Sequence, residues 1–109
     1  MIYHLARVED WDAALDAGEY RVSTLGQTLD EVGFIHASTA EQLPGVAERF
    51  YRDEPGDLVV LEIDESALDV RWEDIGGGEL YPHIYGPIRS ADVRSVTPAY
   101  FEDDGGFAT

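Results

Sequence analysis

Three histidines stand at matching positions in this chain, each at the end of an expected strand. His4 closes the first apolar strand, His36 follows Phe34 and Ile35, and His83 opens a later apolar segment. Strand ends are places where side chains from several elements converge and stay accessible to ligands. The shared context predicts that the three imidazoles line one site.

Three kinds of chemistry fit such a cluster. In the first, the histidines hold a catalytic metal ion such as zinc, although their wide separation lacks the close spacing of common zinc motifs. In the second, the histidines and neighbouring tyrosines bind a polar ligand by hydrogen bonds and stacking. In the third, the imidazoles lie at the edge of the core and bond only to the backbone. A Ser-His-Asp triad has little support, because the chain has no Gly-x-Ser-x-Gly elbow.

Two amphipathic helices are expected to hold these strand ends in place. Val8, Trp11 and Leu15 recur on one face of the first helix, which places Trp11 in the core, and Gly18 suits its C-terminal end. The second helix has a core-facing stripe with the same periodicity, made of Leu43, Val46, Ala47, Phe50 and Tyr51.

Turn-forming residues mark both ends of the second helix. Thr39 and Gln42 match a capping box. Pro44 removes a backbone hydrogen bond, which indicates a start near residues 40–41 or an irregular first turn. Pro55 lies in the segment that ends the helix.

Short strands supply most of the remaining structure. Leu58–Ile63 is continuous and rich in β-branched residues, so it is expected to be the central strand, covered on both faces. Residues 70–73 alternate between apolar and polar, and residues 93–97 form the last strand. Residues 81–88 contain two prolines and are therefore expected to be an edge strand or a short segment set between bends.

Residues 19–33 are the least regular part of the chain. Extended residues Tyr20, Val22 and Leu25 come before one expected helical turn at residues 28–32. A long irregular stretch is often a functional loop. The order of the elements predicts an α+β fold in which two helices pack on a bent, mostly antiparallel split sheet.

Length and composition describe one domain. The chain has 109 residues, 44% of them hydrophobic, enough for a core over residues 1–100. The acidic tail, residues 101–109, is expected to fray. No cysteine is present, which excludes disulfides and thiolate metal sites. No apolar segment approaches the roughly 20 residues that span a bilayer, and acidic residues near the N-terminus are unlike a signal peptide. A cytoplasmic location is expected.

The charge excess limits the partners of the protein. There are 23 acidic residues against seven basic ones, all arginine, which gives a formal net charge of −16. Phosphate backbones and anionic membranes are bound through clusters of Lys and Arg. The composition therefore disfavours nucleic acid and membrane partners, leaves a small-molecule ligand as the expected partner, and is silent on partner proteins.

Four sequence motifs carry a resemblance to a known family. They are Ile2-Tyr3-His4, Trp11 with Ala14 and Gly18-Glu19-Tyr20, Gly33-Phe34-Ile35-His36-Ala37-Ser38, and Tyr81-Pro82-His83-Ile84-Tyr85-Gly86-Pro87. In this order, over roughly residues 1–98, they resemble the small bacterial family called domain of unknown function 952. The resemblance implies a distant similarity to the ADP-ribosyltransferase fold, nearest to its RNA 2′-phosphotransferase branch.

The resemblance also implies roles for the histidines. In that fold a split sheet holds NAD, and a histidine on the first core strand contacts a ribose of the cofactor. His4 and Tyr85 would therefore position the ribose. His36 would orient the substrate or polarise a phosphate, and His83 would line the same cleft.

Ser38 and Arg21 complete the expected ligand contacts, with Arg21 as a partner for a pyrophosphate. The glutamate of the toxin-like branch has no counterpart at a matching position, although Glu79 lies near the His83 motif. NAD is the candidate cofactor. The expected functions are an NAD-dependent ADP-ribosyl or phosphoryl transferase-like enzyme, a non-catalytic binding or regulatory module, or a metal-dependent hydrolase with three histidine ligands.

The charge predicts that the protein does not bind tRNA or duplex DNA at physiological salt. Counterion release drives such binding, and the sequence offers no basic run through which it could act. A gel-shift assay at micromolar protein checks this expectation, and salt-sensitive retention of either nucleic acid would contradict it.

Overall fold

A computed structural model of the chain describes residues 1–24, 26–54 and 56–109. Two residues singled out in the sequence lie outside the described residues. They are Leu25 of the irregular segment and Pro55 at the end of the second helix. All three histidines fall inside the described ranges.

The main sheet has four antiparallel strands, with Leu58–Ile63 at its centre as the sequence predicts. Its order is β1 (Ile2–Arg7), β6 (Leu58–Ile63), β10 (Val93–Phe101) and β11 (Phe107–Ala108). Strand β6 pairs with β1 on one side and with β10 on the other, and five of its six residues are buried. A continuous apolar strand is stable in this central place because both of its faces are covered.

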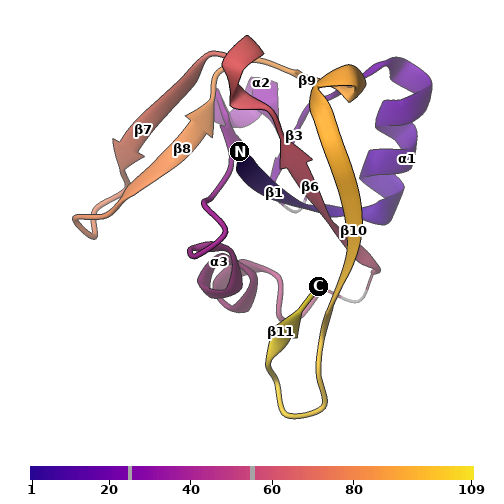
Figure 1. The fold of residues 1–109 in the computed structure, drawn as a ribbon, viewed down its shortest axis with the longest axis vertical. Coiled ribbons are helices and arrows are strands. Elements are labelled where there is room, and N and C mark those ends of the chain that lie inside the picture. The colour runs from indigo at the N-terminus through magenta and orange to yellow at the C-terminus, as the bar shows by residue number, and fades with distance from the viewer. Residues whose placement is uncertain (25, 55) are drawn as a thin grey trace.

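A second sheet carries two of the histidines. Strand β8 (Leu80–Ile84) lies between β5 (Ile35–His36) and β7 (Val70–Asp74), and both pairings are antiparallel. The β7–β8 hairpin projects away from the main sheet (Figure 1). The two sheets meet where Tyr3 and Ser38 form an isolated bridge, with two backbone N–H···O bonds of 2.8 Å. The fold is α+β with antiparallel sheets, as predicted.

The irregular segment and the remaining connections form short elements. Strand β2 (Glu19–Tyr20) pairs with β9 (Ile88–Arg89), and β3 (Val22–Thr24) pairs with β4 (Gln27–Thr28). Single turns of 3-10 helix precede β7 and β10, at Glu65–Ala67 and Ser90–Asp92. Backbone hydrogen bonds between these short strands therefore fix much of residues 19–33.

Three helices pack against the sheets, one more than predicted: α1 (Val8–Ala17), α2 (Leu29–Val32) and α3 (Leu43–Phe50). The additional helix, α2, is the single turn expected at residues 28–32, and a capping box between Thr28 and Glu31 starts it. Helix α3 begins at Leu43, so Pro44 lies in its first turn, where a missing N–H breaks no intrahelical bond. No helix in the described ranges combines the length and apolar composition needed to cross a membrane.

Helices α1 and α3 cover opposite faces of the main sheet. Leu61 of β6 belongs to the core cluster that contains Trp11 of α1, which is 7% exposed as expected for a core residue. Its neighbour Val60 belongs to the cluster that contains Ala47 of α3. Successive side chains of a strand point to opposite faces. The helices therefore lie on either side of the sheet, as Figure 1 shows.

Residues 81–88 do not form an edge strand, one of the two expected arrangements, because β8 lies in the middle of its sheet. The carbonyl of Pro82 accepts a hydrogen bond from the N–H of Ala37 at 3.1 Å. The nitrogen of Pro82 points to the same side of the strand, where β5 has already ended at His36. The missing N–H therefore falls outside the β7 ladder, and a central strand can contain this proline.

Residues 101–109, the segment expected to fray, form backbone and aromatic contacts in the structure. Strand β10 runs on to Phe101, and β11 pairs back onto it. The N–H of Glu102 donates to the carbonyl of Gly106 at 2.7 Å, and the rings of Phe101 and Phe107 lie 5.6 Å apart. A tight turn and an aromatic pair hold this hairpin despite the acidic run between its strands. The structured part of the domain therefore extends beyond residue 100.

Two glycine substitutions should change stability in opposite directions. Gly18 ends α1 with φ of +86°, a conformation that costs an alanine about 1–2 kcal/mol. Gly45 lies inside α3, and an added Cβ would meet nothing within 4 Å. Gly18→Ala should therefore lower the free energy of unfolding, whereas Gly45→Ala should raise it by about 0.5–1 kcal/mol. Urea denaturation measures both, and equal effects would contradict these backbone assignments.

Candidate functional site

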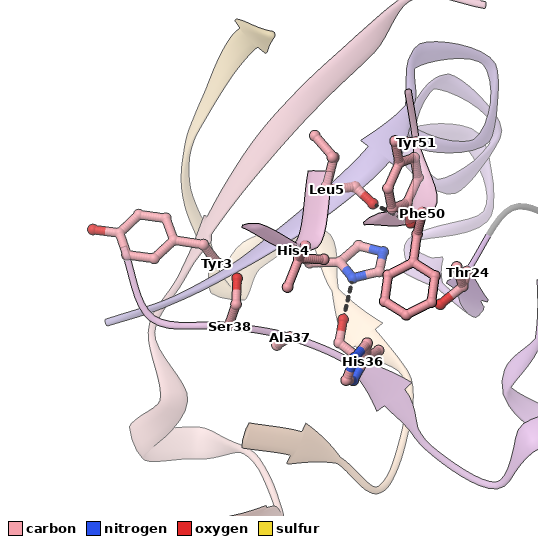
Figure 2. Close-up of a pocket in the computed structure, with 10 residues that line it drawn as sticks. Tyr3, His4, Leu5, Thr24, His36, Ala37, Ser38, Phe50 and Tyr51 are labelled. Atoms are coloured by element: carbon pink, nitrogen blue, oxygen red, sulfur yellow. Dashed lines mark hydrogen bonds between the residues drawn. The ribbon is translucent and has the colours of Figure 1, made fainter. Parts of the chain in front are cut away.

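His4 is a buried residue that uses both of its ring nitrogens. It is 2% exposed. Its Nδ1 lies 2.6 Å from the carbonyl oxygen of His36 (Figure 2). Its Nε2 lies 3.0 Å from the hydroxyl of Tyr20. Because a carbonyl only accepts, the tautomer assigned from these partners carries its proton on Nδ1. Nε2 then accepts a hydrogen bond from Tyr20, so His4 has no lone pair to offer a ligand.

His36 and His83 face each other across the β5–β8 pairing. They are directly opposite in the antiparallel register, and their ring centroids are 5.1 Å apart. Two of their nitrogens, Nδ1 of His36 and Nε2 of His83, are buried and have no hydrogen-bond partner among the described residues. Buried polar atoms are nearly always paired, and leaving one unpaired costs about 1–3 kcal/mol. Two such atoms side by side mark this pair as the candidate functional centre.

Glu73 of β7 orients His83 from the solvent side. One carboxylate oxygen, Oε1, accepts a hydrogen bond from Nδ1 of His83 at 2.9 Å and another from the hydroxyl of Tyr85 at 2.5 Å. The neutral form of His83 therefore carries its proton on Nδ1, which makes Nε2 an acceptor. The hydrogen bond from Tyr85, followed by that from His83, holds the pKa of Glu73 below its usual value. Arg71 lies 4.2 Å above the ring of Tyr85 and adds positive charge nearby.

Burial keeps His36 neutral at physiological pH. Desolvation lowers the pKa of His36 to about 4, and the neighbouring His83 adds to the effect. Phe34 stacks on the ring of His83, with centroids 4.0 Å apart and an angle of 15° between the planes. The same Phe34 makes an edge contact with His36. The two imidazoles are thus enclosed by an apolar ring on one side and a carboxylate on the other.

Two small cavities adjoin the histidines. The first, of about 10 Å³, lies between His4, His36 and Phe50 and has room for a single water molecule. The second, of about 70 Å³, lies between α3 and the β7–β8 hairpin. Its lining combines His36 with the cation Arg49 and with apolar and aromatic side chains, namely Val46, Phe50, Ile75 and Tyr81. Arg49 has no carboxylate partner within the described part of the chain, so it is available to an anion.

The structure brings four of the six residues singled out in the sequence into one contact network. His4, His36, His83 and Tyr85 are connected through the contacts above. Ser38 is 1% exposed and lines the smaller cavity beside His4.

Arg21 does not belong to that network. It is an exposed residue whose guanidinium pairs with Glu19 at 2.7 Å and with Asp30 at 3.0 Å. Glu79, which lies near the His83 motif in the sequence, accepts a hydrogen bond from Gln42 at 2.8 Å instead.

Sequence reasoning missed Glu73, Phe34 and Arg49 as site residues. Glu73 pairs directly with Tyr81, so it lies diagonally across the ladder from His83 on the same face. A hairpin with its tip at the glycines 76–78 would have given this register from the sequence. No comparable signal pointed to Arg49, because its proximity to His36 depends on how α3 packs.

Comparison with known proteins places the chain in a family. Its sequence matches the family described as "Protein of unknown function (DUF952)" over residues 5–96, most of the chain. The chain belongs to the DUF952 family. No curated protein matches the chain at a significant level. The family assignment agrees with the motifs around His36 and His83, and the description of DUF952 assigns no activity.

Solved structures of another protein show the same fold. The crystal structure of protein CC0527 from Caulobacter crescentus, a structural genomics target, is 30% identical to this chain. It superposes with a TM-score of 0.85 over 98% of this chain and 92% of the other. The solution NMR structure of CC0527 gives a TM-score of 0.77 at 30% identity, over 96% and 89% of the two chains. The α+β arrangement is thus shared with CC0527 over nearly the whole length.

The donor atoms of this DUF952 chain do not favour a metal centre with three histidine ligands. Both nitrogens of His4 are committed to protein partners. Within the described ranges, no group of three or more His, Cys, Asp or Glu side chains is arranged to hold a metal ion. A metal bound by His36 and His83 would need a third ligand that His4 cannot supply without breaking two hydrogen bonds.

The neutral histidines predict a loss of stability on mild acidification. Burial lowers the pKa of His4, like that of His36, to about 4, whereas an unfolded histidine titrates near 6.5. Between these values the unfolded chain binds more protons, so stability is complete above pH 6.5 and falls as the pH drops toward 4. Urea denaturation between about pH 7 and pH 5 should show this fall, of up to roughly 2 kcal/mol per fully buried histidine over that interval.

The variant His4→Leu separates this effect from general acid sensitivity. It should unfold more easily at pH 7, because Tyr20 and the His36 carbonyl lose their partner at about 1–3 kcal/mol each. It should also show a shallower dependence on pH than the wild type, since one neutral buried imidazole is gone. An unchanged slope in this variant would contradict the burial of a neutral His4.

Proposed function

We propose that this protein binds a small anionic ligand, or the anionic group of a nucleotide-like ligand, in the cavity between α3 and the β7–β8 hairpin. The observation that carries the proposal is the His36–His83 pair with its two unpartnered buried nitrogens. Unpaired buried nitrogens cost free energy, and such costs are typical of functional sites, where a ligand can supply the missing hydrogen-bond partner. His36 lines the cavity directly, and His83 lies behind it.

The charge at the cavity supports an anion. Arg49 is the cation in its lining and has no carboxylate partner among the described residues. A guanidinium binds phosphate or carboxylate oxygens through several N–H groups in a fixed geometry. A neutral His36 can donate a further N–H to the same anion without adding charge. This local arrangement selects an anion in a protein whose overall charge is −16.

The size of the cavity limits how much of the ligand is enclosed. Its volume of about 70 Å³ suits a phosphoryl or carboxylate group, whereas whole-ligand pockets usually measure about 300–1,000 Å³. NAD as a whole does not fit, so only an anionic group of such a ligand would be enclosed. The rest of a nucleotide-like ligand would lie across the rim, where Phe50 and Ile75 are 39% and 46% exposed and offer apolar surface to a base or ring.

The Glu73–His83 pair is the candidate acid–base group of the site. A carboxylate that holds Nδ1–H of an imidazole fixes its tautomer and strengthens Nε2 as a proton acceptor. A non-catalytic binding module is the second candidate, and the burial of Nε2 favours it, because a proton acceptor must reach the ligand to react. The ADP-ribosyl or phosphoryl transfer implied by the family resemblance is therefore tested after binding.

Calorimetric titration tests the binding proposal with inorganic phosphate, AMP, ADP-ribose and NAD. At least one of these anions should bind, and Arg49→Gln should raise its Kd by about tenfold or more, the effect expected when a charge-assisted hydrogen bond is lost. Arg52→Gln is the matched control, since it removes the same charge from an arginine that pairs with Glu48 and does not line the cavity.

Equal losses of affinity in the two arginine variants would show general electrostatics and would reject the site. The absence of binding by all four anions would reject it as well. For a ligand that binds, Glu73→Gln separates the two candidates. Unchanged affinity with loss of ligand turnover supports acid–base catalysis, and the absence of turnover in the wild type supports a binding module.

A further inference from the structure

A third, larger cavity lies on the other side of α3 and is separate from the histidine site. It has a volume of about 300 Å³ and opens on the face of the main sheet that α3 covers only in part. Its floor is formed by neighbouring side chains of three paired strands, in which Tyr3 and Ser95 flank Glu62. Leu43 and Phe107 stand on its sides. In size it falls within the usual range for small-molecule pockets.

Glu62 is an unusual residue for the floor of such a cavity. It lies in the central strand, whose other five residues are buried and apolar. Glutamate is disfavoured in strands and is costly to bury without a partner. The hydroxyl of Tyr3 donates to its Oε2 at 3.2 Å. Desolvation, followed by this hydrogen bond, raises the pKa of Tyr3. No basic side chain pairs with Glu62 in the described part of the chain.

Tyr3 and His4 are adjacent on β1 and point to opposite sides of the strand, so the cavity at Glu62 is separate from the histidine site. His4 faces the histidine site, and the adjacent Tyr3 points away from it (Figure 2), as the alternation of a strand requires. The other polar side chains that line the cavity carry hydroxyls, namely Tyr3, Ser95, Thr97 and Thr109. Among the described residues, no lysine, arginine or histidine lines this cavity, whereas Arg49 and His36 line the one between α3 and the β7–β8 hairpin.

From this chemistry we infer a second binding site, for a compact organic cation that has one ammonium or guanidinium group and an apolar body. The cation pairs with Glu62 and donates further hydrogen bonds to the hydroxyls of Tyr3 and Ser95. The apolar body packs against Leu43 and Phe107, where the aromatic ring adds attraction for a cation. The overall charge of −16 raises the local concentration of such ligands.

Benzylammonium, with its neutral analogue benzyl alcohol, tests this inference by NMR titration of backbone amides at constant ionic strength. Benzylammonium should shift the amides of Tyr3, Glu62 and Ser95, and benzyl alcohol should bind at least about tenfold more weakly. Glu62→Gln keeps the shape of the side chain and should weaken benzylammonium binding by about tenfold or more. Glu48→Gln, which removes the same charge from the exposed surface of α3, should leave it unchanged.

Several outcomes would overturn the inference. These are the absence of saturable shifts with millimolar benzylammonium, equal binding of benzyl alcohol, or equal losses in Glu62→Gln and Glu48→Gln. The last result would show attraction to the acidic surface in general. A dispersed amide spectrum of Glu62→Gln confirms that the variant is folded, and Tyr3→Phe, which removes only a hydroxyl, gives a second reading with a smaller expected loss.

Discussion

One side-chain hydrogen bond, made by His4, links the main sheet to the sheet that carries His36 and His83. Nδ1 of His4, on the first strand of the main sheet, donates to the carbonyl of His36 on the second sheet at 2.6 Å. Tyr20 supports it from behind, and the Tyr3–Ser38 bridge continues the junction beside it. Because β5 has only two paired residues, this side chain fixes a strand that backbone pairing alone would hold weakly. His36 is thereby placed opposite His83. In the proposed site, His4 is thus a positioning residue and not a ligand contact.

Two cavities with opposite charge preferences lie on the two sides of α3. On one side, the neutral His36 and Arg49 line a small cavity suited to an anion. On the other, Glu62 and surrounding hydroxyls form a larger cavity suited to a cation. Helix α3 contributes to both because successive residues of a short helix face different directions. A protein with a strongly acidic composition can in this way present one local environment for an anion and another for a cation.

The main features of the fold follow from local sequence patterns. The apolar run 58–63 and the periodicity around Trp11 identify the central strand and its covering helix, since burial on a defined face is encoded in spacing. The strand-end positions of the histidines also predicted that their side chains lie close together. What the sequence does not show is long-range geometry. Pro82 is tolerated in a central strand because of where a neighbouring strand ends, and Glu73 reaches His83 only in one hairpin register. The sequence predicts an accessible His4, whereas the structure buries it. Its hydrogen-bond partner Tyr20 comes from the irregular segment, so local patterns do not show this contact.

The most direct test of the central claim is the imidazole ¹⁵N NMR spectrum of the protein at pH 7, recorded with and without inorganic phosphate. His4 and His83 should each carry a proton on Nδ1, because their partners there are a carbonyl and a carboxylate. Phosphate should then change the signals of His36 and leave those of His4 in place, since only His36 lines the cavity that contains Arg49. A proton on Nε2 in place of Nδ1 of His83, or a response to phosphate from His4 and none from His36, would contradict the account.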